Sequence, residues 1–238
     1  MAFAAVLLAV TGGDHQAAVK PPAQQSGPLL PDPQRLGPAP GTSVSTYVAA
    51  AGDRMAALDS LSSSQRLEAV VDFTGYISPL AIDELLATTP GIDVLRGYAR
   101  VPPPANARIH VLITSTESDL PTALGAAHDA ASAIATHYAH VLNESVAHPS
   151  TQLQEELQAG AAQAAEARVD AAGLGTDCGC VFALVVSGPV AQLQQLAAAA
   201  AVRLVDPAPS TVSLEALMVV PLEPQEKSTV TALEFAGD

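Results

Sequence analysis

The cysteines of this chain, Cys178 and Cys180, lie in the stretch TDCGCVFALVV and are separated by one glycine. A zinc site needs four ligands, usually from paired knuckles of Cys or His, and no second knuckle accompanies this pair. A redox pair usually has two intervening residues and a helix after it, where the helix dipole lowers the thiol pKa, but VFALVV predicts a strand. Two alternatives stay open. A turn at Gly179 would allow a local disulfide, or both thiols are unpaired.

The histidines offer a second kind of chemistry. His137 and His140 lie three residues apart in a segment that predicts a helix, so they share a face. A metal site there needs further ligands, for which Asp129 and Glu144 are the nearest candidates. His110 lies in a predicted strand with nothing to place it near the cysteines. We expect solvent-facing histidines, no metal site and no cofactor.

Catalytic motifs are incomplete in this chain. Ser187 lies in VVSGP, which lacks the first glycine of a Gly-x-Ser-x-Gly elbow. The glycine-rich stretch around Gly173 lacks the lysine of a phosphate-binding loop and precedes a strand, not a helix. Neighbouring acids such as Glu155 and Glu156 diverge around a helix and form no acid–base pair. We therefore expect a protein that is not an enzyme and has no catalytic residues.

Composition limits the partners. The chain has 238 residues, 49% of them hydrophobic, with 3% aromatic residues and no Trp, so its core must be built from Ala, Val and Leu. The formal net charge of −14 argues against nucleic acid, which is bound mainly through Lys and Arg. It also argues against docking on anionic lipid surfaces.

The N-terminal part predicts a tether. Residues 2–10 are apolar but too few for a transmembrane helix, which needs about 20, and no basic residue precedes them as in a signal peptide. We expect residues 1–12 to be the end of a truncated membrane anchor; a frayed tail or a short strand is the alternative. Residues 13–43 form a Pro-rich linker. This order predicts an extracytoplasmic protein of the cell envelope, touching the membrane only through the anchor; the alternative is cytoplasmic.

An internal repeat predicts the fold. Residues 78–96 align without a gap on residues 188–206, with Pro79 on Pro189. Apolar and turn residues around both segments predict strand, helix, strand, strand, over residues 44–116 and 174–238. Two such units predict an α+β sandwich of the ferredoxin-like kind, with helices on one face of the sheet and the other face open. Chance similarity in an Ala-rich chain is the alternative. The inner face of the first helix is expected to be Leu80, Leu85 and Leu86, and that of the second Val190, Leu193 and Leu196.

Residues 117–173 predict an inserted antiparallel helical hairpin. Apolar and small residues recur at alternating spacings of four and three, the pattern of a packed seam, at Leu120, Leu124, Ala127, Ala131, Ile134, Tyr138, Val141 and then Leu153, Leu157, Gly160, Ala164 and Ala167. The segment contains eight acidic residues and one basic residue, a formal charge of −7. We expect an interaction surface at Glu155, Glu156, His137 and Tyr138, and a homodimer through the small-residue seam.

One stretch resembles a known family. ISPLAIDELLATTPGIDVL, residues 77–95, is similar to the helix and return strand of subtilase propeptides. These are small ferredoxin-like domains that chaperone or inhibit a protease. The resemblance implies the fold, and it implies such a chaperone or inhibitor role as one alternative. The predicted hairpin at 117–173 has no counterpart in that family, and no protease domain follows in this chain.

These patterns lead to one expected function and two alternatives. We expect a non-enzymatic bacterial envelope domain that mediates protein–protein interaction as an accessory, scaffold or sensor domain, with an unidentified protein partner. The Ala- and Pro-rich composition is typical of a GC-rich bacterial genome. The first alternative is a small-ligand-binding module, for which Asp72, Tyr76 and Arg100 are the polar side chains to examine. The second is the protease-directed role.

Overall fold

A computed structural model of the chain describes residues 34–60, 63–103, 108–114, 119–209, 217–233 and 235. The chain divides into a unit Met1–Asp32 and a unit Pro33–Asp238. The predicted anchor at 1–12 and most of the predicted linker lie outside the described residues.

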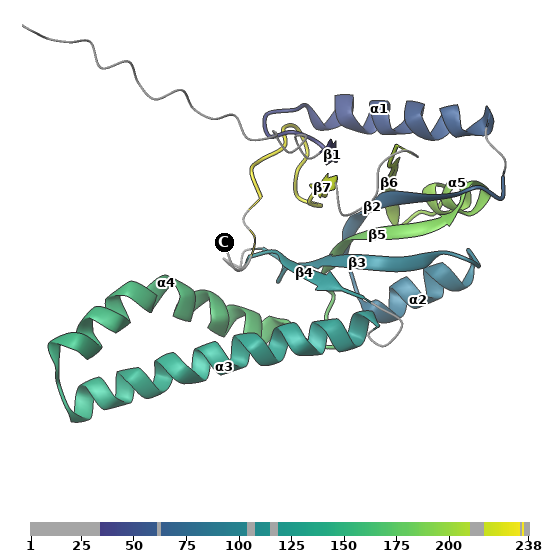
Figure 1. Ribbon diagram of the computed structural model, residues 1–238. Helices are drawn as coiled ribbons and strands as arrows, with labels where there is room; N and C mark the ends of the chain where they lie inside the picture. The colour runs from purple at the N-terminus through teal and green to yellow at the C-terminus, as the bar shows by residue number, and fades with distance from the viewer. Residues whose placement is uncertain are drawn as a thin grey trace, which may run out of the picture. The chain divides into compact units, whose positions relative to one another are not determined.

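The described residues form a mixed helix and sheet structure, which confirms the α+β class (Figure 1). In chain order the elements are β1 (Gln34–Leu36), α1 (Val44–Ala57), β2 (Arg66–Ile77), α2 (Pro79–Ala87), β3 (Asp93–Ala99), β4 (His110–Ile113), α3 (Leu120–Ala147), α4 (Thr151–Gly173), β5 (Val181–Pro189), α5 (Val190–Ala197), β6 (Val202–Pro207) and β7 (Leu217–Val219). A short 3-10 helix, Leu58–Ser60, follows α1.

A five-stranded antiparallel sheet with the order β4-β3-β5-β2-β6 is the centre of the fold. Strand β5 lies between β2 and β3, which α2 connects, and β2 lies between β5 and β6, which α5 connects. The two strand–helix–strand units are thus interlocked, each contributing a strand between those of the other. The last strands of the two predicted repeats have different partners. Strand β4 joins this sheet, whereas β7 pairs with β1 in a separate two-stranded ribbon.

Helices α2 and α5 cover one face of the sheet. Ile82, Leu193 and Leu196 are buried in the same cluster as Val71 and Leu184 of the sheet. The second helix has the predicted inner face. In the first, Leu80 is 69% exposed and the prediction was wrong at this position. The positions of Leu80 and Ile82 around the helix explain the difference.

Helix α2 begins at Pro79, and the hydroxyl of Ser78 accepts a hydrogen bond from the amide of Ala81. This start puts Pro79 and Ile82, three residues apart, on the buried side. Leu80 then points away from the sheet. The burial of Pro79 and Ile82 on one face therefore leaves Leu80 on the other side of the helix.

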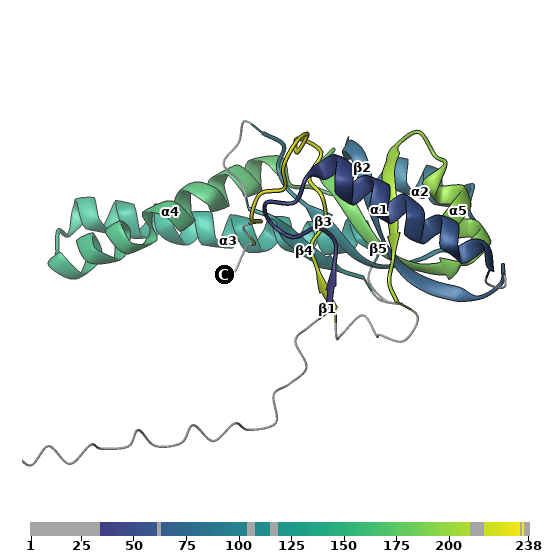
Figure 2. The ribbon, with the colours of Figure 1, turned by 90° about the horizontal axis from the view of Figure 1, so that it is seen from above.

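The other face of the sheet is covered as well, so the expectation of an open face was wrong. Val70, Tyr98 and Phe182 on this face are buried against Leu36 of β1 and Val219 of β7. Helix α1 lies on the same side, opposite α2 (Figures 1 and 2). Consecutive apolar residues in β2 explain the cover, because a strand without polar alternation is buried on both faces.

The predicted linker ends earlier than expected. Strand β1 lies inside the segment 13–43 and pairs in parallel with β7. Leu36 is buried, and the amide of Val220 donates to its carbonyl at 2.8 Å. A proline-rich segment can still form such an edge strand, because an edge needs amides on one side only.

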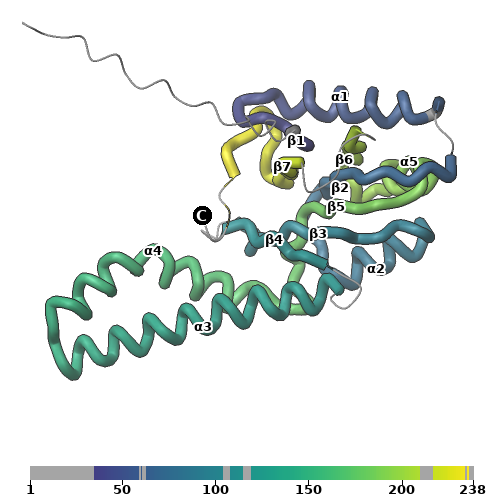
Figure 3. Tube along the Cα trace, in the orientation of Figure 1, coloured from purple at the N-terminus to yellow at the C-terminus, as the bar shows by residue number. Residues whose placement is uncertain are grey.

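Helices α3 and α4 are joined by residues 148–150 and lie side by side (Figures 1, 2 and 3). Ser150 caps α4 by accepting from the amide of Leu153 at 3.2 Å. Buried residues of both helices include the predicted seam positions Leu124, Ala131, Val141, Gly160, Ala164 and Ala167. At Gly160 the approach is closest, because any Cβ there would overlap the ring of Tyr138.

Two glycine substitutions test this contact. Gly160→Ala should lower the free energy of unfolding by about 1–3 kcal/mol, because the added methyl displaces the Tyr138 ring. Gly125→Ala is the matched control: its Cβ would meet only Thr176, at an ordinary 3.8 Å. In α3 this change should raise the free energy of unfolding by about 0.5–1 kcal/mol through helix propensity. Urea denaturation measures both, and equal effects of the same sign would contradict the close packing.

Candidate functional site

A pocket of about 560 Å³ lies where α3 and α4 meet the sheet next to β4. Most of its wall is made of small apolar side chains: Ala127, Ala130, Ala131, Ile134, Ala159, Ala162 and Ala167. The polar side chains that line it are Arg108, His110, Gln163, Glu166 and Asp170. A mainly apolar hollow with a few convergent polar groups is typical of a small-molecule site.

Two elements supply the charged groups. His110 opens β4, and its side chain lies on the side of the strand that carries the buried Leu112. Glu166 and Asp170 are four residues apart in α4 and therefore share a helix face. The fold brings these faces together, so that His110 Nε2 lies 2.9 Å from Asp170 Oδ2 and Arg108 Nε lies 3.0 Å from Glu166 Oε2.

Asp170 is the most unusual member of the pocket. The residue is only 4% exposed, and its second oxygen, Oδ1, has no hydrogen-bond partner among the described residues. A buried carboxylate oxygen without a donor costs free energy, because the water that it loses is not replaced. A ligand that brings an N–H or O–H donor to Oδ1 would remove that cost. The described residues that line the pocket include no Ser, Thr, Cys or Lys.

The predicted interaction surface lies on the same two helices. His137 Nε2 is 3.1 Å from Glu156 Oε1, and the rings of His137 and Tyr138 are in edge contact at 5.1 Å. The hydroxyl of Tyr138 donates to Gln163 Oε1 at 3.2 Å, which connects this surface to the pocket. Glu155 is exposed on α4. Three of the four predicted residues are thus brought together.

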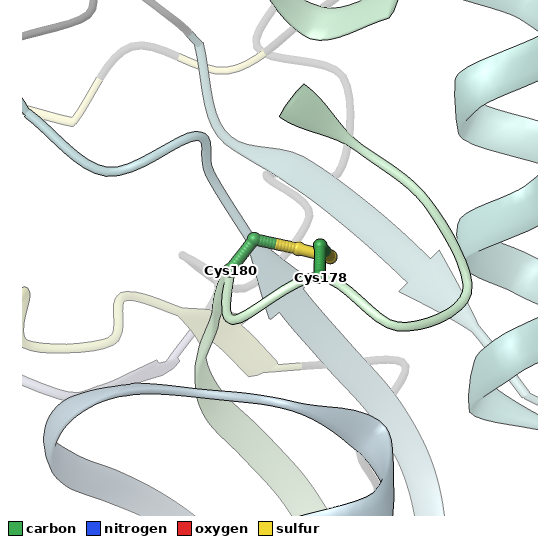
Figure 4. Close-up of a disulfide and its surroundings, with 2 residues drawn as sticks. All are labelled: Cys178 and Cys180. Carbon is green, nitrogen blue, oxygen red and sulfur yellow. A yellow bond between two sulfur atoms is a disulfide. The ribbon is translucent and has the colours of Figure 1, made fainter. Parts of the chain in front are cut away.

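The structure joins Cys178 to Cys180 as a disulfide, with the Cα atoms 5.2 Å apart (Figure 4). The pair lies in the loop between α4 and β5, where the amide of Cys178 donates to the carbonyl of Gly175. Cys180 is fully buried at the start of β5, and Cys178 packs against the same core. Of the two alternatives from the sequence, this geometry corresponds to the local bridge.

The described residues contain neither a cluster of metal ligands nor a helix that could span a membrane. In that part of the chain no three His, Cys, Asp or Glu side chains converge as metal ligands. His137 contacts Glu156 across the helix pair, whereas His140 is exposed. No helix in the same ranges combines the length and the apolar character needed to span a membrane.

Asp72, Tyr76 and Arg100, the residues expected for a ligand site, gather on the other face of the sheet and bind the chain itself. Asp72 Oδ1 accepts from the amide of Leu222 at 3.0 Å. The hydroxyl of Tyr76 donates to Gln225 at 2.8 Å, and Arg100 pairs with Glu223 at 2.7 Å. These contacts hold residues 222–225 on the sheet, and Asp72 Oδ2 and Arg100 Nε have no hydrogen-bond partner among the described residues.

Two acidic side chains, Asp72 and Asp206, are buried on the face of the sheet that residues 222–225 cover. Burial raises the pKa of Asp72 well above the ordinary carboxyl value, and the negative charge of Asp206 adds to the effect. Asp206 accepts hydrogen bonds from Tyr47 at 2.8 Å and from Arg54 at 2.7 Å. Burial and the nearby Glu223 raise the pKa of Tyr76 to about 12. Asp72 therefore favours its neutral form in the folded protein.

The residues of the pocket were not found from the sequence. His110 and Asp170 are 60 positions apart, and no motif links them. One signal was present: Glu166 and Asp170 lie beside the small-residue seam of α4, where acidic side chains are rare unless they have a partner. Comparison of the chain with protein-family models, with curated proteins and with solved structures gives no match.

The raised pKa of Asp72 predicts a pH dependence of stability. Above about pH 4 the unfolded chain ionises Asp72 while the folded chain keeps its proton, so the free energy of unfolding falls as pH rises toward the folded pKa. Asp72→Asn keeps an acceptor for Leu222 but cannot ionise. We expect the variant to be more stable than the parent at pH 8, by at least about 1.4 kcal/mol, the equivalent of one pKa unit.

Urea titrations at pH 4 and pH 8 measure the effect. At pH 4 the two proteins should be alike to within about 1 kcal/mol. Asp53→Asn, on the exposed side of α1, is the control and should follow the pH course of the parent. A constant difference between Asp72→Asn and the parent at both pH values would show that Asp72 is not neutral in the fold.

Proposed function

We propose that this chain is a small-ligand-binding module whose site is the pocket between α3, α4 and β4. One observation carries the proposal: Asp170, a buried carboxylate with one oxygen that has no donor among the described residues, lines an apolar hollow of about 560 Å³. Sites for small molecules have this size and this combination of apolar wall and few polar groups. The lining offers hydrogen-bonding and charged groups that can hold a small ligand.

We further propose that the core is a ferredoxin-like sandwich with an inserted helical hairpin. The strand order β6-β2-β5-β3, with α2 and α5 on one face, supports this interpretation, because two interlocked split β-α-β units make that fold. Strand β4 and the α3–α4 pair then form the insertion between the two units. The pocket lies where the insertion meets the core.

Filling the pocket tests the proposal. Ala162→Phe places a large ring at a position of α4 that lines the hollow and is solvent-accessible, so it should block ligands without disturbing the core. A fragment library screened by ligand-observed NMR against the parent should give binders that this variant loses. Ala126→Phe, exposed on α3 and outside the pocket lining, is the matched control.

Binders in the parent should also raise its melting temperature, because a ligand that binds only the folded state stabilises it. That rise should persist in Ala126→Phe and vanish in Ala162→Phe. Fragments that bind all three proteins equally would place the binding elsewhere on the chain and refute the pocket as the site.

A second candidate function is protein–protein interaction, the function expected from the sequence, and the structure suggests the far end of α3 as a surface for it. Leu142 is 46% exposed and Val146 is 76% exposed, and both lie on α3 in the part that precedes the turn to α4. Together with the cluster of His137, Tyr138 and Glu156 they form a mixed apolar and polar surface. The partner that this surface suits first is a second copy of the chain.

The joined cysteines support an oxidising, extracytoplasmic compartment. Alkylation of the cysteines in intact cells tests this compartment directly.

Charge placed on this surface tests the dimer. Changing both Leu142→Glu and Val146→Glu should weaken self-association about tenfold or more, because two apolar contacts are lost and like charges meet. Analytical ultracentrifugation over a range of concentrations gives the association constant. Ala133→Glu adds charge to an exposed position of the same helix and should change it little. A parent protein that stays monomeric at every concentration would remove the homodimer.

A further inference from the structure

We infer that the pocket selects a small organic ammonium cation with an apolar body, and that Asp170 is the residue that recognises its charge. This inference rests on the proposed function, because it names the ligand class of the same site. It follows from three features of the pocket: its balance of charge, the position of the unused oxygen and the character of the wall.

The charge balance of the lining favours a cation. Arg108 and Glu166 form an ion pair at 3.0 Å and offset each other. His110 Nε2 lies 2.9 Å from Asp170 Oδ2, and Oδ1 has no hydrogen-bond partner among the described residues. The surrounding segment 117–173 carries eight acidic side chains and one basic side chain. An anion would meet this negative field, whereas a cation gains from it.

The unused oxygen specifies a hydrogen-bond donor as well as a charge. An ammonium group that reaches Oδ1 forms a charge-assisted N–H···O bond, which is stronger than a bond between neutral groups. A metal ion does not fit as well, because no third ligand converges with His110 and Asp170 among the described residues. A hydroxyl ligand would also satisfy the oxygen, but without the charge that strengthens the N–H···O bond of an ammonium group.

The wall specifies the rest of the ligand. Ala127, Ala131 and Ile134 of α3 face Ala159 and Ala162 of α4 across the pocket. Methyl groups offer no hydrogen bonds, so the part of the ligand that lies between the helices must be hydrocarbon. Their small size leaves room for a ring or a short chain. The expected ligand therefore has an ammonium head at Asp170 and an apolar body between α3 and α4.

Three probes of one shape test the inference on the full chain. Isothermal titration with benzylammonium, benzyl alcohol and benzoate compares positive, neutral and negative heads on the same ring. We expect benzylammonium to bind about tenfold or more tightly than benzyl alcohol, and benzoate to bind least. In Asp170→Asn, the preference for benzylammonium over benzyl alcohol should disappear. Asp129→Asn, which removes an exposed acid of α3 outside the pocket lining, should keep it.

The outcomes separate the inference from the proposed function. Equal affinities for benzylammonium and benzyl alcohol in the unaltered chain would overturn the ammonium inference and leave the pocket as a ligand site. A preference that persists in Asp170→Asn would overturn the role of Asp170. If no probe binds, the ammonium inference fails, and the fragment screen with Ala162→Phe decides whether the proposed function fails with it. The comparison of probes uses the unaltered chain, so it does not depend on the folding of a variant.

Discussion

Strand β5 is buried on both faces along Val181–Val186, and this constraint organises the rest of the molecule. A strand that is apolar on both sides needs a layer above and a layer below, because exposed apolar surface of this extent is unfavourable in water. On one side α2 and α5 supply the layer. On the other side the layer is assembled from α1, the β1–β7 ribbon and the C-terminal segment, which come from opposite ends of the chain.

The second layer is held by polar contacts where the first is held by packing. Asp72, Arg100 and Asp206 each bind a group from another element, and each is wholly or largely buried on that side of the sheet. Such buried polar groups add little net stability, but they penalise arrangements in which a partner is missing. They specify which segment lies on the sheet. Residues that seemed suited to a ligand from their position on a strand are thus occupied by the chain itself.

The α3–α4 pair combines two consequences of small side chains. At Gly160 the absence of a side chain lets the ring of Tyr138 approach the helix, so the pair is closely packed there. Nearer the sheet the same composition has the opposite effect, because alanines such as Ala131 and Ala162 do not fill the space beside β4. The pocket is the space that remains, and the charged groups His110 and Asp170 lie at its wall. The proposed site is therefore a product of packing small residues against a strand edge.

The sequence by itself determined the α+β class, which depends on the pattern of neighbouring residues. This class follows from local propensity and from periodicity, which act over a few residues. Only the tertiary structure decided the cover of the second face, the use of Asp72, Tyr76 and Arg100, and the meeting of His110 with Asp170. The physical reason is that those contacts join elements far apart along the chain, and their partners are chosen by how whole layers pack.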